Sequence, residues 1–298
     1  MRFQERSMKP DYDETIISHY NKIAEEYGLS SRSTMEDEIV RKKETTIIRD
    51  FVEHVAYEWR SDFAQNGEYA TKKNGDKDLI ILDVGCGNGY TIKCLAGDFT
   101  SYSYIGVEYN DKLRELALQQ VTGLANVRVL PGDLRVRETI NIKNESVDIL
   151  LCQRVLINLL SHHDTKLALN NILSLVKSNG RLLFIEAFSS GLANLNNARG
   201  EFGLEPIGPA YHNKYLEDDF FSHPDLQPCP MPSFNIPKNI LSTHYYVSRV
   251  LHAALLQQLQ QSDWKRNSHF VKFVSTALPD GVGDYAPLQF HFFIKKGG

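Results

Sequence analysis

An apolar run passes into a helical pattern through Leu82-Asp83-Val84-Gly85-Cys86-Gly87-Asn88-Gly89-Tyr90. Glycine lets the backbone turn sharply and approach a ligand without a Cβ in the way. The pattern therefore predicts a strand that ends near Val84, a glycine loop, and a helix that follows the loop. In an open parallel sheet the ligand crevice lies at the carboxyl ends of the strands, and this loop falls at such an end.

The spacing of the glycines distinguishes between ligands. The dinucleotide fingerprint has the spacing GxGxxG, whereas this loop reads GxGxG, with Tyr90 in place of the last fingerprint glycine. Asp83 precedes the loop, where a carboxylate would repel a pyrophosphate but suits an amino group. S-adenosylmethionine carries an amino group next to a cationic sulfonium, so the loop favours this cofactor over NAD. A strand-to-helix turn with glycines for packing is the plainer alternative.

Acidic residues stand at the ends of the next two predicted strands. Glu108 ends the second strand, where a carboxylate can accept hydrogen bonds from both ribose hydroxyls. Tyr109 beside it could lie against adenine. Asp133 follows the third strand and could accept the adenine amine, with the Leu134 backbone N–H serving a ring nitrogen. Taken singly, these residues also fit a solvated charge, a core tyrosine and a Pro-Gly turn.

Short apolar runs alternate with helical patterns along the chain around the loop. We expect strands over 79–84, 102–108, 127–130, 147–152 and 181–186. We expect helices over 89–97, 111–122 and 163–177. This alternation predicts βαβ units and a mostly parallel sheet that is covered on both faces. Two further strands, over 269–276 and 288–295, are expected to close the sheet as an antiparallel hairpin.

The glycine loop, Glu108 and Asp133 together resemble the nucleotide-binding motifs of class I S-adenosylmethionine-dependent methyltransferases, over about residues 79–186. The resemblance implies an α/β, Rossmann-like fold with a seven-stranded methyltransferase sheet. It also implies that the loop holds the methionine part, Glu108 the ribose and Asp133 the adenine, with two residues after the fourth strand bordering the methyl donor. The core residues expected at the cofactor are Asp83, Gly85, Cys86, Gly87, Asn88, Glu108, Tyr109, Asp133, Leu134, Cys152 and Gln153.

Segments outside these motifs refine the resemblance. Residues 33–35, 153–159 and 211–215 resemble a bacterial subgroup associated with surface-polysaccharide and small-molecule biosynthesis. In related enzymes the amino-terminal helices cover the cofactor. Three residues of these helices are therefore candidate lid contacts, although core packing of an amphipathic helix also accounts for each: Tyr20, Tyr27 and Met35.

The texture of the chain predicts its division into parts. Two helices within 11–60 belong to an N-terminal helical cap over residues 1–78, and residues 79–298 form the methyltransferase core. Residues 187–262 form an acceptor-side insertion after the fifth strand. Its part over 187–240 is rich in proline and aromatic residues, which is typical of lids and substrate loops.

Methyl transfer requires an aligned nucleophile and the exclusion of water, and a hydroxyl nucleophile also needs a base. His212, in the long insertion, is the leading base candidate. Glu186 ends the fifth strand and fits a base or a structural carboxylate. Arg154 follows the fourth strand, where a guanidinium suits an anionic acceptor or forms a structural ion pair.

Composition narrows the function classes. The net charge of −4 and the missing Asn/Asp-Pro-Pro-aromatic box argue against a nucleic-acid methylase. No apolar run reaches the roughly 20 residues of a membrane span. The polar start lacks a signal-peptide core, and four scattered cysteines indicate a reduced, cytoplasmic protein. No metal is expected, because adjacent histidines such as His162 and His163 point in different directions on a helix.

We therefore expect an S-adenosylmethionine-dependent methyltransferase that acts on an oxygen of a small molecule or sugar-type acceptor. N-methylation of a small molecule is the near alternative. An NAD-dependent oxidoreductase and a non-catalytic cofactor-binding scaffold are the other two alternatives, and a homodimer is left open.

Overall fold

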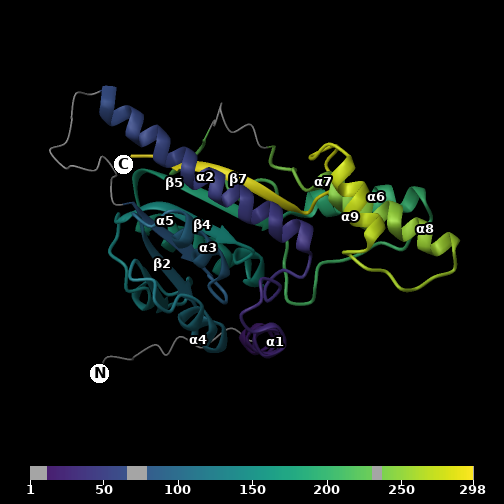
Figure 1. Cartoon of the computed structure of the whole chain (residues 1–298), viewed down its shortest axis with the longest axis horizontal. Coiled ribbons are helices and arrows are strands. Elements are labelled where there is room, and N and C mark those ends of the chain that lie inside the picture. Colours follow the sequence, from purple (N-terminus) through teal and green to yellow (C-terminus); the bar gives the residue numbers. More distant parts are fainter. Residues whose placement is uncertain (1–11, 66–78, 230–236, 298) are drawn as a thin grey trace.

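The central sheet contains seven strands (Figure 1). The computed structural model describes residues 12–65, 79–229 and 237–297, and the strand count applies to these residues. The strands lie in the order β3-β2-β1-β4-β5-β7-β6. Their bounds are β1 Ile80–Val84, β2 Ser103–Glu108, β3 Val127–Pro131, β4 Val147–Gln153, β5 Val176–Ala187, β6 Leu226–Pro228 and β7 Leu288–Lys295.

Strands β1 to β5 are parallel, so their carboxyl ends meet at one edge of the sheet. Asp83 of β1 is in register with Gly106 of β2 and Leu151 of β4. Strand β7 runs antiparallel between β5 and β6. The predicted fold class, an α/β Rossmann-like methyltransferase sheet of seven strands, is confirmed.

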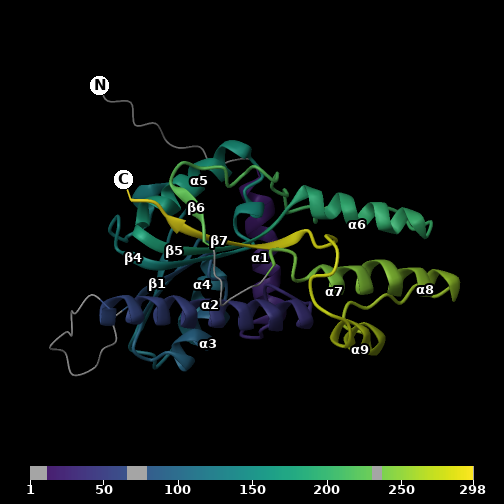
Figure 2. The ribbon, with the colours of Figure 1, turned by 90° about the horizontal axis from the view of Figure 1, so that it is seen from above.

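Helices cover both faces of the sheet (Figure 2). The helices α2 (Glu38–Gln65), α3 (Tyr90–Asp98) and α4 (Asp111–Gln120) pack on one face, and α5 (His162–Leu175) packs on the other. Each face has its own apolar core, because alternate strand residues point to opposite sides. Ile81 thus packs with α2, whereas Leu82 packs with α5. Two single 3₁₀ turns, η1 (Arg137–Thr139) and η2 (Leu156–Asn158), follow β3 and β4.

Helix α1 (Asp13–Tyr27) crosses the carboxyl edge of the sheet, apart from both cores (Figures 1 and 2). It lies against the start of α4, where Asn110 Nδ2 donates to Asn21 Oδ1 at 3.0 Å. The segment after α1 lies against the glycine loop, because Asn88 Nδ2 donates to the Gly28 carbonyl at 2.9 Å. The amino-terminal segment and the glycine loop therefore enclose the same edge of the sheet.

A helical lobe projects beyond this edge (Figure 1). Its helices are α6 Ser189–Glu201, α7 Ser242–Tyr246, η3 Val247–Leu251, α8 His252–Gln258 and α9 His269–Ala277. Leu195 and Ala198 of α6 pack on Val250 to form a small core of their own. At η3 the helix widens to a π turn, a feature that is frequent at functional sites.

Two sequence expectations about the lobe are wrong. Residues 269–276, expected as a strand, form α9, so β7 pairs with β5 and β6 instead of closing a hairpin. Val271 and Ser275 face inward four residues apart, and Ser268 caps the helix by accepting from the Val271 N–H. The start of the insertion was not predicted to be regular, yet it forms α6.

One sequence expectation includes residues that the structure does not describe, and another concerns membrane-spanning helices. Residues 1–11 and 66–78 of the expected cap, and residues 230–236 of the expected insertion, lie outside the described residues. Among the helices that are described, none is long and apolar enough to cross a lipid bilayer.

Candidate functional site

A cleft opens at the carboxyl edge of the sheet between the glycine loop and α1; we call it the loop cleft. It encloses about 1020 Å³ of empty space, including open solvent at its mouth. Ten of the fourteen residues expected at the cofactor line it: Tyr20, Asp83, Gly85, Cys86, Gly87, Glu108, Tyr109, Asp133, Leu134 and Gln153.

The glycine loop adopts a backbone that only glycine accepts readily. Gly85 and Gly87 have φ values of +65° and +57°, in the left-handed region. A Cβ at Gly85 would collide with Val155, and one at Gly87 would meet Thr34. The Gly85 N–H donates to the Val107 carbonyl at 2.7 Å. The loop is thereby held against β2 with its backbone exposed to the cleft.

Asp83 is a buried carboxylate without a full set of partners. Its side chain is 2% exposed, and Oδ1 accepts from Gln153 Nε2 at 3.5 Å. Oδ2 has no hydrogen-bond partner among the described residues. Burial, together with the charge of Glu108, raises the pKa of Asp83 to about 7. A ligand ammonium group in the cleft would supply the missing partner.

Glu108 is tied to the backbone on both sides of the cleft. Its Oε2 accepts from the Gly87 N–H and its Oε1 from the Asn110 N–H, each at 2.8 Å. Burial raises the pKa of Glu108 despite these bonds. Each oxygen keeps a second lone pair, so the carboxylate can still accept from a pair of ligand hydroxyls.

The sequence alone suggested that Asp133 is free to bind a ligand, but in the structure Arg135 engages its carboxylate. Arg135 donates to it through Nε at 2.9 Å and Nη2 at 2.7 Å. The same guanidinium donates to Asp13 of α1 through Nη1 at 2.6 Å and Nη2 at 3.0 Å. Tyr109 donates to Asp13 at 3.0 Å and lies under Arg135, 5.3 Å from ring centroid to guanidinium. We call Asp13, Arg135 and Asp133 the α1 latch.

The α1 latch was missed from the sequence. Asp13 is 3% exposed and Arg135 is 8% exposed, so both charges are buried where α1 meets the core. Nothing in the spacing of the two residues, 122 positions apart, indicates the pair. The available signal was a pair of acids, Asp13 and Glu14, in the first turn of a predicted helix, which reads as ordinary helix capping.

Four expected cofactor residues lie outside the loop cleft. Asn88 is buried and binds the Gly28 and Ser30 carbonyls. Cys152 is buried beneath the cleft, where burial and then the charge of Glu186 raise the pKa of its thiol. Two more belong to other surroundings: Tyr27, which donates to Glu36 at 2.8 Å, and Met35, which lines a second cavity.

Glu186 organises backbone and does not line the loop cleft. It is fully buried, and its oxygens accept from the N–H groups of Val155, Leu156 and Ile157 at 2.8, 3.1 and 3.2 Å. Burial raises the pKa of Glu186 to about 7. These contacts fit the structural alternative for Glu186, since the carboxylate anchors the turn after β4.

We predict that Glu186→Ala lowers the free energy of unfolding by about 3 kcal/mol, because three buried N–H groups lose their acceptor at ~1–3 kcal/mol each. Glu186→Gln keeps an acceptor oxygen and should lose less than half of that. Urea unfolding of both variants measures the difference. An alanine variant as stable as the parent protein would contradict this positioning role.

His212, the leading base candidate, lies outside both cavities. Its ring stacks on His19 of α1 with centroids 3.6 Å apart and also contacts Tyr20 and Tyr211. Burial, followed by the charge of His19, lowers the pKa of His212 to about 4. The ring is therefore neutral at physiological pH and packs the lobe loop against α1.

The second cavity lies between the sheet edge and the lobe; we call it the lobe cavity. It is lined by residues of α6, η3 and α8 and by the start of β7. Arg154 lines both cavities and joins them. Its backbone has φ +55°, a strained value for arginine, and its guanidinium pairs with the fully buried Glu44 of α2.

Clusters of potential metal ligands are absent from the described part of the chain. No group of three or more His, Cys, Asp or Glu side chains there is arranged to hold a metal ion. The chemistry that the two cavities offer is instead a carboxylate pair for a cationic, hydroxyl-bearing ligand, joined through Arg154 to an arginine-rich chamber.

Asp83 predicts the pH dependence of ligand binding. In the free protein its pKa is about 7, so below that pH the side chain carries a proton. A ligand ammonium needs the carboxylate and displaces that proton. Affinity for an amino-acid-bearing ligand should therefore fall up to about tenfold per unit as the pH drops from 7 to 5.5.

Calorimetry in two buffers of different ionisation enthalpy tests this coupling. About one proton should be released on binding at pH 6 and almost none at pH 8. An affinity that stays level or rises toward pH 5.5 would rule Asp83 out as the ammonium partner.

Comparisons with known proteins agree with this geometry. Residues 81–180 match a family model described as a methyltransferase domain. The uncharacterised protein MJ0638 of Methanocaldococcus jannaschii is 31% identical over 114 residues, which are 38% of this chain and 43% of that relative. The chain thus matches less than half the length of this curated relative. The family match over residues 81–180 covers β2, β3 and all of β1 except its first residue, and the carboxyl ends of these strands border the loop cleft.

Solved structures show more distant likenesses. CrArsM, an arsenic(III) S-adenosylmethionine methyltransferase from Chlamydomonas reinhardtii, is 22% identical, with 38% of this chain and 40% of that one covered and a TM-score of 0.32. The YcgJ protein from Bacillus subtilis is 16% identical, with 74% and 93% covered and a TM-score of 0.41.

Proposed function

We propose that this chain, in which residues 81–180 are a methyltransferase domain with S-adenosylmethionine as its cofactor, transfers a methyl group to an oxygen of a small molecule or sugar-type acceptor. The observation that carries the proposal is Asp83 Oδ2, a buried carboxylate oxygen without a partner in the described structure, in the wall of the loop cleft. A cofactor with an ammonium group supplies that partner. A pyrophosphate cofactor would place negative charge there instead.

The residues of the loop cleft fit S-adenosylmethionine in parts. Asp83 and the backbone of Gly85 and Gly87 would hold the amino-acid end, and the free lone pairs of Glu108 would accept the ribose hydroxyls. The Leu134 backbone would hold adenine beside Tyr109, while the Asp133 carboxylate stays engaged by Arg135. When bound, the cofactor supplies a methyl group whose carbon–sulfur bond breaks as the acceptor bond forms, with the electron pair left on sulfur.

The chain's own contribution is alignment and exclusion of water. Tyr20 of α1 closes the cleft from above and is held by Asn158 Nδ2 at 2.8 Å from its hydroxyl. Arg154 marks the passage to the lobe cavity, where we place the acceptor. The arginine-rich wall of that cavity favours an anionic oxygen acceptor over a cationic one.

Titration with S-adenosylhomocysteine, S-adenosylmethionine and NAD by calorimetry tests the cofactor. We expect the two adenosyl compounds to bind and NAD to bind at least about 100-fold more weakly, since an unpartnered carboxylate meets pyrophosphate. Binding of NAD alone would replace the proposal with the oxidoreductase reading. Binding of the adenosyl compounds without methyl transfer to any acceptor class would favour the scaffold.

A further inference from the structure

The lobe cavity has an excess of positive charge. Four arginines line it, and Asp37 is the one carboxylate among its described lining residues. The four are Arg154, Arg199, Arg249 and Arg266. Arg154 pairs with Glu44, a carboxylate that it shares with Arg41, and Arg266 lies 3.6 Å from Glu36 at the exposed rim. The remaining pair, Arg199 and Arg249, sets the character of the chamber.

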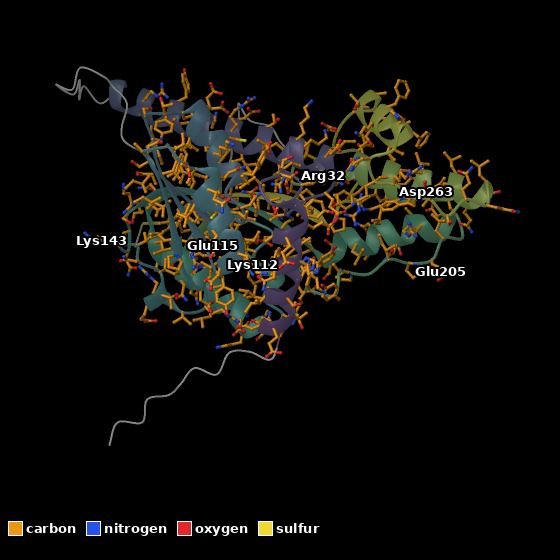
Figure 3. The ribbon with its side chains drawn as sticks, turned by 60° about the horizontal axis from the view of Figure 1, so that its bottom comes forward. Arg32, Lys112, Glu115, Lys143, Glu205 and Asp263 are labelled. Atoms are coloured by element: carbon orange, nitrogen blue, oxygen red, sulfur yellow. The ribbon has the colours of Figure 1, made fainter. Side chains whose placement is uncertain are left out.

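Arg199 is buried without a carboxylate partner in the described structure. It is 9% exposed, and its guanidinium donates to the backbone carbonyls of Glu205, at 2.9 and 2.7 Å, and of Arg249. The Glu205 side chain itself is exposed on the outer side of the lobe (Figure 3). Burial, followed by the charge of Arg249, lowers the pKa of Arg199.

Arg249 stands in the π turn of η3, where the widened backbone turn carries its side chain to the cavity. Its guanidinium lies 3.9 Å from the Tyr245 ring centroid and donates to Ser248 Oγ at 2.7 Å. Arg249 Nη2 lies 3.7 Å from Asp37 Oδ2, but that oxygen already lies 2.8 Å from His244 Nε2. The charge of Arg249 is therefore only partly matched.

Much of the remaining wall is apolar, although the side chains of Asn213, Gln257 and Gln261 also line it. Leu192, Leu195, Ile207, Leu256 and Trp264 line it alongside the arginines. A hydroxyl-covered sugar would leave these side chains against polar groups, whereas an apolar chain or ring would bury them. The wall thus presents cationic groups at one part and hydrophobic surface at another.

We propose that the lobe cavity binds the methyl acceptor as an amphipathic organic anion, with a carboxylate or phosphate at Arg249 and Arg199 and an apolar body against the leucines of α6 and α8. This inference rests on the proposed function and narrows its acceptor. Guanidinium groups bind such anions through paired hydrogen bonds, and a ligand anion would neutralise two like charges that the fold holds close together.

The chemistry of the wall agrees with an acceptor that is already nucleophilic. Over the described lining residues the cavity holds no histidine, lysine, cysteine or glutamate, and Asp37 is engaged by His244. Two tyrosines, Tyr215 and Tyr245, also line it, but burial raises the pKa of each hydroxyl. A hydroxyl acceptor would have no poised base there, whereas an ionised oxygen needs none.

Calorimetry on the protein saturated with S-adenosylhomocysteine tests the acceptor class. The probes are sodium octanoate, octyl phosphate, 1-octanol, octylammonium chloride and glucose. Octanoate or octyl phosphate should bind at least about tenfold more tightly than the uncharged and cationic probes, and the comparison of the two anions identifies the head group. Equal or tighter binding of glucose, octanol or octylammonium overturns the proposal, as does no anion binding at all.

Variants locate the anion. Arg249→Gln should weaken the preferred anion about 10- to 100-fold, the loss expected for one charged hydrogen-bonded contact, while Arg249→Lys should lose less than half of that on a logarithmic scale. Arg32→Gln is the matched control, because Arg32 also lies over a tyrosine, Tyr27, yet is exposed outside the cavity (Figure 3). Equal losses in the Gln variants at positions 249 and 32 would overturn the assignment.

Cofactor affinity keeps the two proposals apart. Each variant should bind S-adenosylhomocysteine as the parent does, which also shows that it is folded, because neither arginine lines the loop cleft. If that compound fails to bind the parent protein, the proposed function fails. If it binds and the octyl anions do not, only the acceptor class fails.

Discussion

Asp83→Asn should lower the affinity for S-adenosylhomocysteine by about 100-fold or more. Removing one member of a buried charge pair costs ~2–5 kcal/mol in binding. In the free protein the same change should increase stability above pH 7. The pKa of Asp83 is raised to about 7 from an unfolded value near 3.8, so ionisation of this buried side chain lowers the stability of the parent protein as the pH rises toward and through 7. The loss amounts to ~2–4 kcal/mol, and a neutral asparagine avoids it.

The predicted loss of affinity and the predicted gain in stability have opposite signs, so a variant that is simply misfolded would not produce both. Calorimetry gives the affinity, and urea unfolding at pH 6 and 8 gives the stability. 5′-Methylthioadenosine, which lacks the amino-acid part, should bind the parent and Asp83→Asn equally. Asp263→Asn is the control, because Asp263 is exposed on the lobe (Figure 3). Equal losses for both adenosyl ligands would contradict the ammonium contact, and an unstable asparagine variant would contradict the raised pKa.

Arg135→Met should release α1 from the core. Arg135 joins the buried Asp13 to Asp133, and removing one partner of a buried ion pair costs ~3–5 kcal/mol. Because Asp13 can regain water when α1 lifts, the loss should appear as local opening rather than global unfolding. Opening should become about 100-fold or more easier, and bound S-adenosylhomocysteine should dissociate correspondingly faster.

Amide hydrogen exchange across α1 and stopped-flow release of the ligand measure these effects. The matched control is Lys112→Met, since Lys112 also links α4 to α1 through Glu25, but as an exposed pair (Figure 3). Such pairs contribute about 0–1 kcal/mol. Asp13→Asn combined with Arg135→Met should restore part of the protection by removing the unpaired buried charge. Unchanged exchange in α1 for Arg135→Met would show that the latch does not hold the helix.

Local patterns were sufficient for the parallel part of the sheet. Hydrophobic runs predicted β1, β2, β4 and the second half of β5, because strands buried on both faces are nearly continuous in apolar residues. The same patterns failed at α9, because an amphipathic helix and an alternating strand are hard to distinguish over eight residues. They also failed to predict α6, whose glycine and asparagine content is low in helix propensity. Packing of Leu195 on Val250 supports that helix.

The sequence by itself determined the glycine loop, the acids Asp83 and Glu108, and their meeting at one edge, because spacing along parallel strands sets where their carboxyl ends lie. Only the tertiary structure decided which carboxylate oxygens already have partners in the protein. Asp133 is taken by Arg135, Glu186 by three backbone N–H groups, and Asp83 Oδ2 keeps no partner in the described structure. Those contacts join residues far apart in the chain. Burial and partners, rather than residue type, decide what a buried carboxylate can still bind.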